Sequence, residues 1–94
     1  MEMWELRLFV AGSDLASRRV HEALETLCQK HLAGRHRIVL VDIFQDPEQA
    51  EAYDIVAVPT LLRQTPPPWR RVIGDLSQTG KVLLGLGMPA PEES

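Results

Sequence analysis

The sequence predicts an α/β fold that begins with a strand–helix–strand unit, and three patterns along the chain support this. Residues 4–10 largely alternate apolar and polar side chains, as a strand does, whereas residues 15–32 follow the period of a helix. Residues 38–44 are nearly all apolar and β-branched, which is typical of a buried strand. Such a unit implies a parallel strand pair and a right-handed crossover. The 94 residues suit one domain, residues 1–94, with a modest core.

The first strand and the first helix are each expected to bury an apolar face. Phe9 adds apolar surface to one face of the strand, and the other face is formed by Trp4, Leu6, Leu8 and Val10. Ser13 or Asp14 can cap the helix, and Gly34 is suited to end it. The apolar positions of the helix are Val20, Leu24, Leu27, Cys28 and His31.

The next two elements are a strand and a short helix. Residues 38–44 are expected to form a central strand that is covered on both faces, because they have almost no polar side. Asp46 is a suitable N-cap, and Pro47 suits the first helical position. This second helix is expected to end near Tyr53 or Asp54.

A strand interrupted by proline is expected at residues 55–62, and a further strand at residues 69–73. Pro59 cannot donate a ladder hydrogen bond, so it belongs at a strand start, an edge or a bulge. At a strand start, a proline can carry a cis peptide bond. In this respect it resembles the proline beside the active-site loop of thioredoxin-like domains.

Residues 77–88 are consistent with two local structures. Ser77 can cap a helix that turns Val82, Leu83 and Leu86 inward. However, each glycine in a helix interior costs about 1 kcal/mol relative to alanine, and this segment contains Gly80, Gly85 and Gly87. Val82–Leu84 suits a strand equally well. Residues 89–94 are expected to form a frayed polar tail.

Composition argues against several classes of protein. The net charge of −3 gives no electrostatic basis for binding nucleic acid or an anionic membrane. No apolar run approaches the roughly 18 residues that span a bilayer. The acidic N-terminus is unlike a secretory signal, and a single cysteine requires no oxidising compartment. We therefore expect a cytoplasmic protein.

The residues that could perform chemistry do not form a recognisable site. Dithiol catalysis needs two cysteines at the first strand–helix turn, and residues 12–17 contain none. Cys28 lies on the apolar helix face and is expected to be a buried hydrophobe. His21, His31 and His36 lack metal-ligand spacing, and His21 with Glu25 is expected to form a solvated pair. We expect no catalytic residue, no metal and no cofactor.

Basic residues surround a run of prolines in the second half of the chain. Arg63, Arg70 and Arg71 flank the segment 66–69, which is three prolines followed by Trp69. The segment can be read as a rigid turn with a core or rim tryptophan. It can equally be read as an interaction surface, because arginine and tryptophan are typical interface anchors.

Seven stretches of the chain carry a resemblance to the KaiB family, small clock proteins that act with the ATPase KaiC. They occur in the order found in that family, and the stretch 70–77 is the most specific. They are residues 6–12, 41–43, 46–51, 59–61, 66–68, 70–77 and 81–86.

The resemblance implies two folds. One is a thioredoxin-like βαβαββα monomer that binds the KaiC ring, captures KaiA and displaces the thioredoxin-like kinase SasA. The other is a βαββααβ ground state that forms homotetramers. Two folds of one sequence differ by only a few kcal/mol, and a partner selects one of them. We expect the thioredoxin-like fold here, and the candidate fold-switch residues are Pro59, Pro66, Pro67, Pro68, Gly85 and Gly87.

By the same resemblance, Arg19, Arg70 and Arg71 are candidate residues for binding a KaiC-type ATPase. The chain is a divergent member: Asp54 replaces a customary lysine, Gly87 replaces a customary aspartate, and the acidic C-terminal extension is short. The implied function is that of a non-catalytic clock or signalling protein whose partners are a KaiC-type ATPase and a KaiA-like protein. The alternative is a thioredoxin-like sensor or redox-type domain with another partner.

Overall fold

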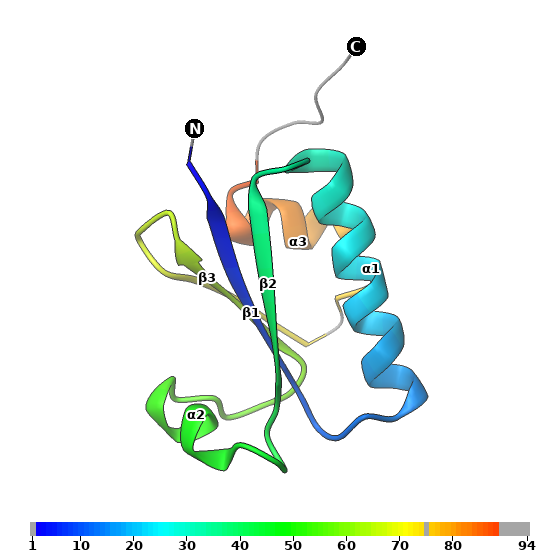
Figure 1. Ribbon diagram of the computed structural model, residues 1–94, viewed down its shortest axis with the longest axis vertical. Coiled ribbons are helices and arrows are strands. Elements are labelled where there is room, and N and C mark those ends of the chain that lie inside the picture. Colours follow the sequence, from blue (N-terminus) through cyan, green and yellow to red (C-terminus); the bar gives the residue numbers. More distant parts are fainter. Residues whose placement is uncertain (1, 75, 89–94) are drawn as a thin grey trace.

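The protein is described by a computed structural model that covers residues 2–74 and 76–88. Its elements follow the order βαβαββα, as expected, and not βαββααβ (Figure 1). The tail expected at residues 89–94 lies outside the described residues. The elements are β1 (Trp4–Val10), α1 (Leu15–His31), β2 (His36–Asp42), α2 (Pro47–Ala52), β3 (Thr60–Thr65), β4 (Arg70–Ile73) and α3 (Thr79–Leu86).

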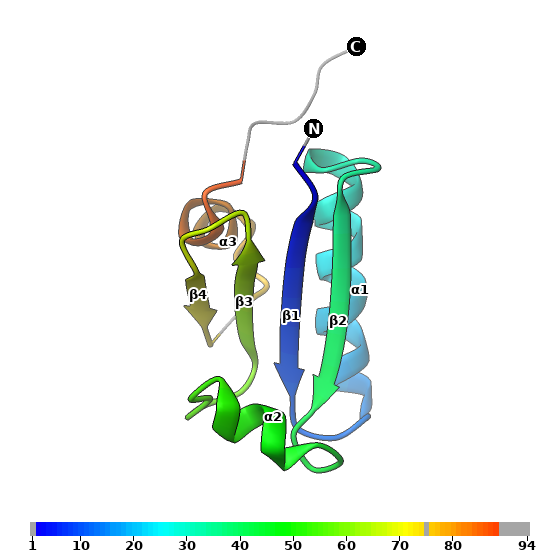
Figure 2. The ribbon, with the colours of Figure 1, turned by 60° about the vertical axis from the view of Figure 1, so that its left-hand side comes forward.

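The four strands form one mixed sheet in the order β2-β1-β3-β4. β1 runs parallel to β2 and antiparallel to β3, and β3 runs antiparallel to β4. Helices α1 and α3 lie on one side of the sheet, while α2 lies on the other side, near the carboxyl ends of β1 and β2 (Figures 1 and 2). No helix among the described residues is long and apolar enough to cross a membrane.

β1 is one of the two inner strands of the sheet, and both of its faces are buried. Leu6 and Leu8 are fully buried on the side of α1 and α3, and Phe9 is fully buried on the other side. The protein has two hydrophobic cores, one on each side of the sheet, and the alternation in the sequence correctly predicts which residues of β1 enter each of them. The larger core contains Trp4, Leu6, Leu8, Val10, Leu24, Cys28, Leu32, Leu61, Val82 and Leu86.

The prediction of a central strand at residues 38–44 is wrong in position and in bounds. β2 spans residues 36–42 and lies at the edge of the sheet, with Leu40 exposed. The strand ends early because one oxygen of Asp42 accepts hydrogen bonds from the backbone N–H groups of Gly12 and Phe44, both at 2.9 Å. These bonds turn the chain out of the sheet and join the two loops at that end.

Asp14, rather than Ser13, caps α1. The Asp14 carboxylate accepts a hydrogen bond of 2.8 Å from the backbone N–H of Ser17. The helix ends at His31, and Gly34 adopts a positive φ of 73° in the turn beyond it. The capping predicted for α2 is confirmed, because Asp46 accepts from the backbone N–H of Gln49.

The proline-interrupted strand predicted at residues 55–62 is partly wrong. β3 begins only at Thr60, after a cis Val58–Pro59 bond, and continues to Thr65. Pro59 has no N–H for the ladder, and the hydroxyl of Thr60 instead donates to the carbonyl of Ala57. Residues 55–59 therefore form an irregular segment that leads into β3.

The segment with two possible structures is a helix, and the strand reading is wrong. α3 buries Val82 and Leu86, but its N-cap is Gln78 rather than Ser77. Gly85 packs closely on β4, since a Cβ atom there would lie 2.5 Å from a methyl carbon of Val72. Gly87 closes the helix in the left-handed conformation with φ of 66°. Close packing and a helix end thus account for two of the glycines.

The side chain of Arg63 lies inside the C-terminal half. It is 6% exposed, and its Nη1 and Nη2 donate to the carbonyls of Leu86 (2.7 Å) and Pro68 (2.8 Å). Its guanidinium carbon lies 5.2 Å from the centre of the Trp4 ring. Burial, followed by the positive charge of Arg70, lowers the pKa of Arg63. One buried cation thus connects the end of α3, the β3–β4 turn and β1.

Replacing Arg63 by methionine should lower the free energy of unfolding by about 2 kcal/mol, because two carbonyls lose their donor in a buried place. Urea denaturation followed by circular dichroism measures this change. The matched control is Arg18→Met on the exposed surface of α1, which should change stability by less than about 0.5 kcal/mol. Equal effects of the two substitutions would contradict the role assigned to Arg63.

Candidate functional site

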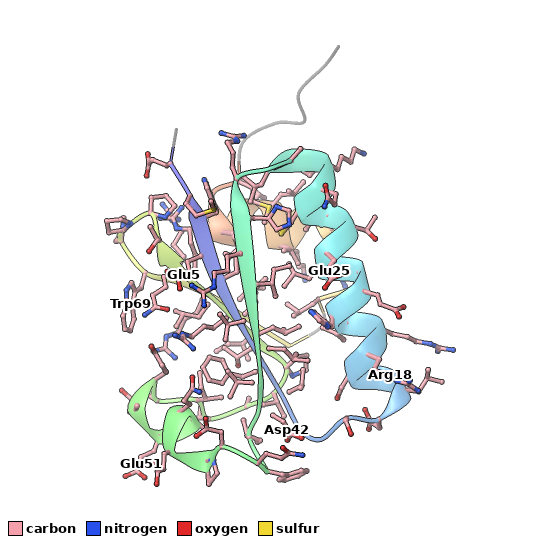
Figure 3. All side chains as sticks on the ribbon, viewed as in Figure 1. Glu5, Arg18, Glu25, Asp42, Glu51 and Trp69 are labelled. Atoms are coloured by element: carbon pink, nitrogen blue, oxygen red, sulfur yellow. The ribbon has the colours of Figure 1, made fainter. Side chains whose placement is uncertain are left out.

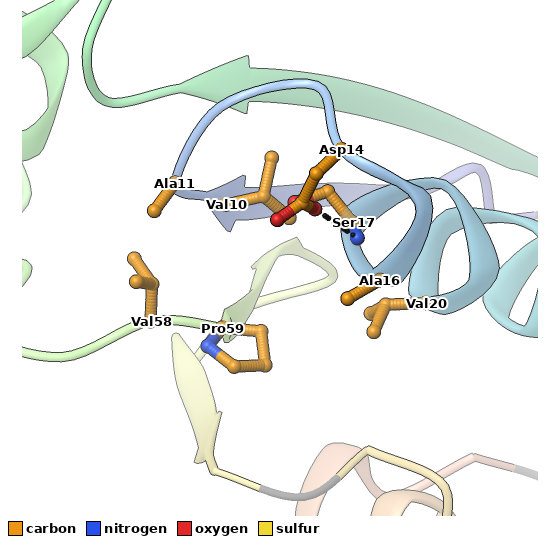
Figure 4. A pocket seen from close by; sticks show the side chains of 8 residues that line it. All are labelled: Val10, Ala11, Asp14, Ala16, Ser17, Val20, Val58 and Pro59. Atoms are coloured by element: carbon orange, nitrogen blue, oxygen red, sulfur yellow. Dashed lines mark hydrogen bonds between the residues drawn. The ribbon is translucent and has the colours of Figure 1, made fainter.

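A surface pocket lies where β1 ends and α1 begins (Figure 4). Its volume is about 190 Å³, and the cis Val58–Pro59 bond forms the wall that faces the helix. Its position is that of the first strand–helix turn, which the sequence singled out together with Pro59. The lining residues are Val10, Ala11, Asp14, Ala16, Ser17, Val20, Val58 and Pro59.

The polar groups of this pocket, Asp14 and the backbone N–H of Ser17, cap the N-terminus of α1. The hydrogen bond from the backbone N–H of Ser17 lowers the pKa of Asp14, so this carboxyl is held in its charged form. No histidine lines the pocket to act as a base for Ser17. His21 instead lies 3.0 Å from Glu25, as expected, and His36 contacts the carbonyl of Leu32. The pocket can bind an apolar group, but it holds no activated nucleophile.

Cys28 is outside the pocket and fully buried in the core, as the sequence predicts. Burial, followed by the negative charge of Glu25, raises the pKa of Cys28 to about 12. A thiol with so high a pKa is a poor nucleophile near neutral pH. Across residues 2–74 and 76–88, no three histidine, cysteine or carboxylate side chains are grouped as a metal site.

Arg19 lies on α1 beside a second surface pocket of about 270 Å³. The other residues of this pocket are Val20 and Ala23 from the same helix and Leu76 and Ser77 from the segment before α3. Arg19 itself is exposed. Its guanidinium is therefore available next to an apolar depression, an arrangement that suits a partner side chain with a neighbouring carboxylate.

The structure separates Arg70 from Arg71. Successive side chains of a strand point to opposite faces. Arg70 is on the side of α3, where its guanidinium carbon would lie 3.7 Å from a Cβ atom at Gly87. Arg71 is on the side of α2, and its Nη1 is 3.5 Å from the carbonyl oxygen of Asp54. The three predicted binding arginines thus occupy three places rather than one patch.

The predicted fold-switch residues lie around the elements that hold the C-terminal half together. Pro59 lines the first pocket, while Pro66, Pro67 and Pro68 form the β3–β4 turn. Gly85 packs on β4, and Gly87 lies beside Arg63. Their role in a change of fold stays a prediction.

The sequence left the exposure of Trp69 open, and two features near this turn were not predicted: the packing of Trp69 on Tyr53 and the burial of Arg63. Trp69 is 51% exposed and lies against Tyr53, with ring centres 5.5 Å apart. Tyr53 was expected only to mark the end of a helix. The burial of Arg63 was also missed, although strand alternation from Leu61 would have placed it on the core face.

Comparison with known proteins gives matches over most of the chain. The family described as the KaiB domain matches residues 7–88. The circadian clock protein KaiB3 of Synechocystis sp. is 40% identical over 81 residues, which cover 86% of this chain and 79% of that protein. The circadian clock oscillator protein KaiB of Thermosynechococcus vestitus is 41% identical over 83 residues, or 88% of this chain and 77% of that protein.

Solved structures with low sequence identity share the fold. The N-terminal domain of Synechococcus elongatus SasA has a TM-score of 0.69 at 21% identity, with 89% of this chain and 81% of that chain covered. The thioredoxin Deadhead of Drosophila melanogaster has a TM-score of 0.69 at 15% identity, with 90% and 82% covered. The fold is therefore thioredoxin-like, as the sequence predicts.

Cys28 should react with Ellman's reagent at pH 8 at least about 100-fold more slowly than free cysteine, because little thiolate forms in the core. Absorbance at the wavelength of the released product measures the rate. A Ser17→Cys variant is the matched control, since it places a thiol in the first pocket, where reaction should be fast. Labelling of Cys28 at the rate of the control would contradict the buried position.

Proposed function

Because this chain belongs to the KaiB family, we propose that it is a non-catalytic clock or signalling protein that binds a KaiC-type ATPase ring. Binding occurs in the thioredoxin-like state and regulates the phosphorylation cycle of the ring. The single observation that carries this proposal is the family match over residues 7–88. The βαβαββα order agrees with the state that the resemblance assigns to ring binding.

The surface chemistry supports recognition rather than catalysis. The pocket beside Pro59 is largely apolar and has no thiol among its lining residues. Arg19, Arg70 and Arg71 are exposed and carry the positive charge that an acidic partner would meet. We assign these three arginines to partner binding, with Arg19 at the depression beside Leu76.

The remaining parts of the proposal concern the assembly. In this fold the chain acts as a monomer in the cytoplasm, and a KaiA-like protein is a second candidate partner. A homotetramer belongs to the alternative βαββααβ fold. Nucleic acid and membranes are not partners in this proposal, since the net charge of −3 favours neither.

Replacing Arg19 by glutamate should weaken binding to a KaiC-type ATPase at least about tenfold, because a charge-assisted contact is lost and a repulsion replaces it. Pull-down and calorimetry with the ring protein, in ATP and in ADP, measure the effect. Arg18→Glu changes the neighbouring exposed arginine, which does not line the depression, and should bind like the parent chain. Failure of the parent chain to bind the ring in either nucleotide would refute the proposed function.

The alternative, a thioredoxin-like sensor or redox-type domain, derives its support from the pocket beside Pro59. If it catalysed thiol exchange, the reaction would depend on Cys28, the one cysteine of the chain. We expect no acceleration of insulin reduction by dithiothreitol, and no difference between the parent chain and Cys28→Ser. Acceleration that disappears in the variant would favour the redox alternative.

A further inference from the structure

Among the described residues, α2 is the one helix on the side of the sheet opposite α1 and α3, and it lies near one end of the strands (Figure 2). A small core that contains Phe9 and Leu62 is buried on this side. Above α2, polar and aromatic side chains of several elements come together, and Figure 3 places Trp69 above Glu51 of α2. The side chains of this surface are Arg7, Tyr53, Gln64, Trp69 and Arg71, and we call it the Trp69 surface.

The ring of Tyr53 is held from several directions. Its centre lies 5.8 Å from that of Phe9, and its hydroxyl accepts a hydrogen bond of 3.1 Å from Gln64. The guanidinium carbon of Arg7 lies 5.2 Å from the ring centre. Arg7 is fixed in turn by donation to the side-chain carbonyls of Gln49 and Gln64, both at 2.8 Å. Tyr53 is therefore a rigid support for a neighbouring ring.

Trp69 packs against Tyr53, and about half of its surface is exposed. Its ring centre lies 5.5 Å from that of Tyr53 with an angle of 39° between the planes. The side chain is nevertheless 51% exposed. An aromatic side chain that is already oriented loses little conformational entropy on binding, and tryptophan is common among the residues that dominate interface energetics.

Arg71 follows Trp69 by two residues and supplies a positive charge on the α2 side of the sheet. Among the described residues, Arg71 makes one hydrogen bond, of 3.5 Å, to the carbonyl of Asp54. Within residues 2–74 and 76–88, no carboxylate lies within ion-pair distance of it. The carboxylates of Glu48 and Glu51 belong to α2, at the end of this side of the sheet. The charge near Trp69 therefore complements an acidic ligand.

We propose that the Trp69 surface binds an acidic segment of the partner, in which a carboxylate pairs with Arg71 and an apolar side chain covers Trp69. This inference rests on the proposed function, because the partner is the KaiC-type ATPase ring. Only one of the two arginines of β4 takes part in this contact. Arg71 belongs to the Trp69 surface, whereas Arg70 lies on the opposite face next to Arg63 and Gly87.

Substitutions on the Trp69 surface should weaken binding of the ADP-bound ring protein. Calorimetry should give a Kd at least about tenfold higher for Arg71→Ala and for Trp69→Ala than for the parent chain. Lys30→Ala and Leu84→Ala are the matched controls, since they remove an exposed cation and an exposed apolar side chain on the other side of the sheet. They should bind within about twofold of the parent. Circular dichroism checks that all four variants keep the fold.

Fluorine NMR can test whether the ring protein contacts Trp69 while every residue of the Trp69 surface is kept. The chain is labelled with 5-fluorotryptophan, so that Trp4 and Trp69 give two fluorine resonances, and Trp69→Phe assigns them. Adding the unlabelled ring protein should change the chemical shift of Trp69 more than that of Trp4, which is 7% exposed.

The outcomes distinguish the two proposals. If the ring binds the parent chain but both variants bind normally and the Trp69 shift is unchanged, the Trp69 surface is wrong and the proposed function stands. If the ring does not bind the parent chain in ATP or ADP, both proposals are wrong. Equal losses in the variants and their controls would also refute the surface, because the effect would then be nonspecific.

Discussion

The buried guanidinium of Arg63 is the interaction on which the C-terminal half of this structure depends. A cation that is removed from water must find compensating hydrogen bonds, and two of the guanidinium nitrogens of Arg63 find them in the carbonyls of Pro68 and Leu86, while its Nε has no partner among the described residues. Those carbonyls belong to the β3–β4 turn and to the end of α3. Because the same side chain lies over Trp4, it also fixes both elements against β1. Gly87 completes the arrangement, since a side chain there would crowd the guanidinium.

The fold combines a thioredoxin-like framework with surfaces suited to binding. In this framework the first strand–helix turn and the proline before β3 face each other across a pocket, and here the pocket holds a capped helix end. The thiol of the chain lies deep in the core instead. The reactive groups are thus buried or engaged, while arginines and one tryptophan remain exposed. Exposed arginine and tryptophan side chains are common at interfaces, so this distribution supports the proposed role in partner binding.

Local signals in the sequence predicted the elements whose stability is local. The alternation in β1 and the capping residues Asp14 and Asp46 placed the first strand and two helices correctly. The edge position of β2 could not be predicted, because strand order depends on which neighbours pair across the sheet. The glycines of α3 made its state ambiguous, and the tertiary contacts that account for them, such as the approach of Gly85 to Val72, could not be read from the sequence. The separation of Arg70 and Arg71 follows from strand alternation and was already implied by the strand expected at residues 69–73.

The ladder between β1 and β3 divides the molecule into an N-terminal βαβ unit and a C-terminal ββα unit. The hydrogen bonds of the first unit, between β1 and β2 and within α1, make no use of the second. Both element orders that the family resemblance implies begin with βαβ. If the chain changes fold as the family resemblance implies, its second half would separate from its first half at the β1–β3 ladder, while β1 and β2 keep their own backbone pairing. Such a change would therefore require β1 to lose its pairing with β3 but not its pairing with β2.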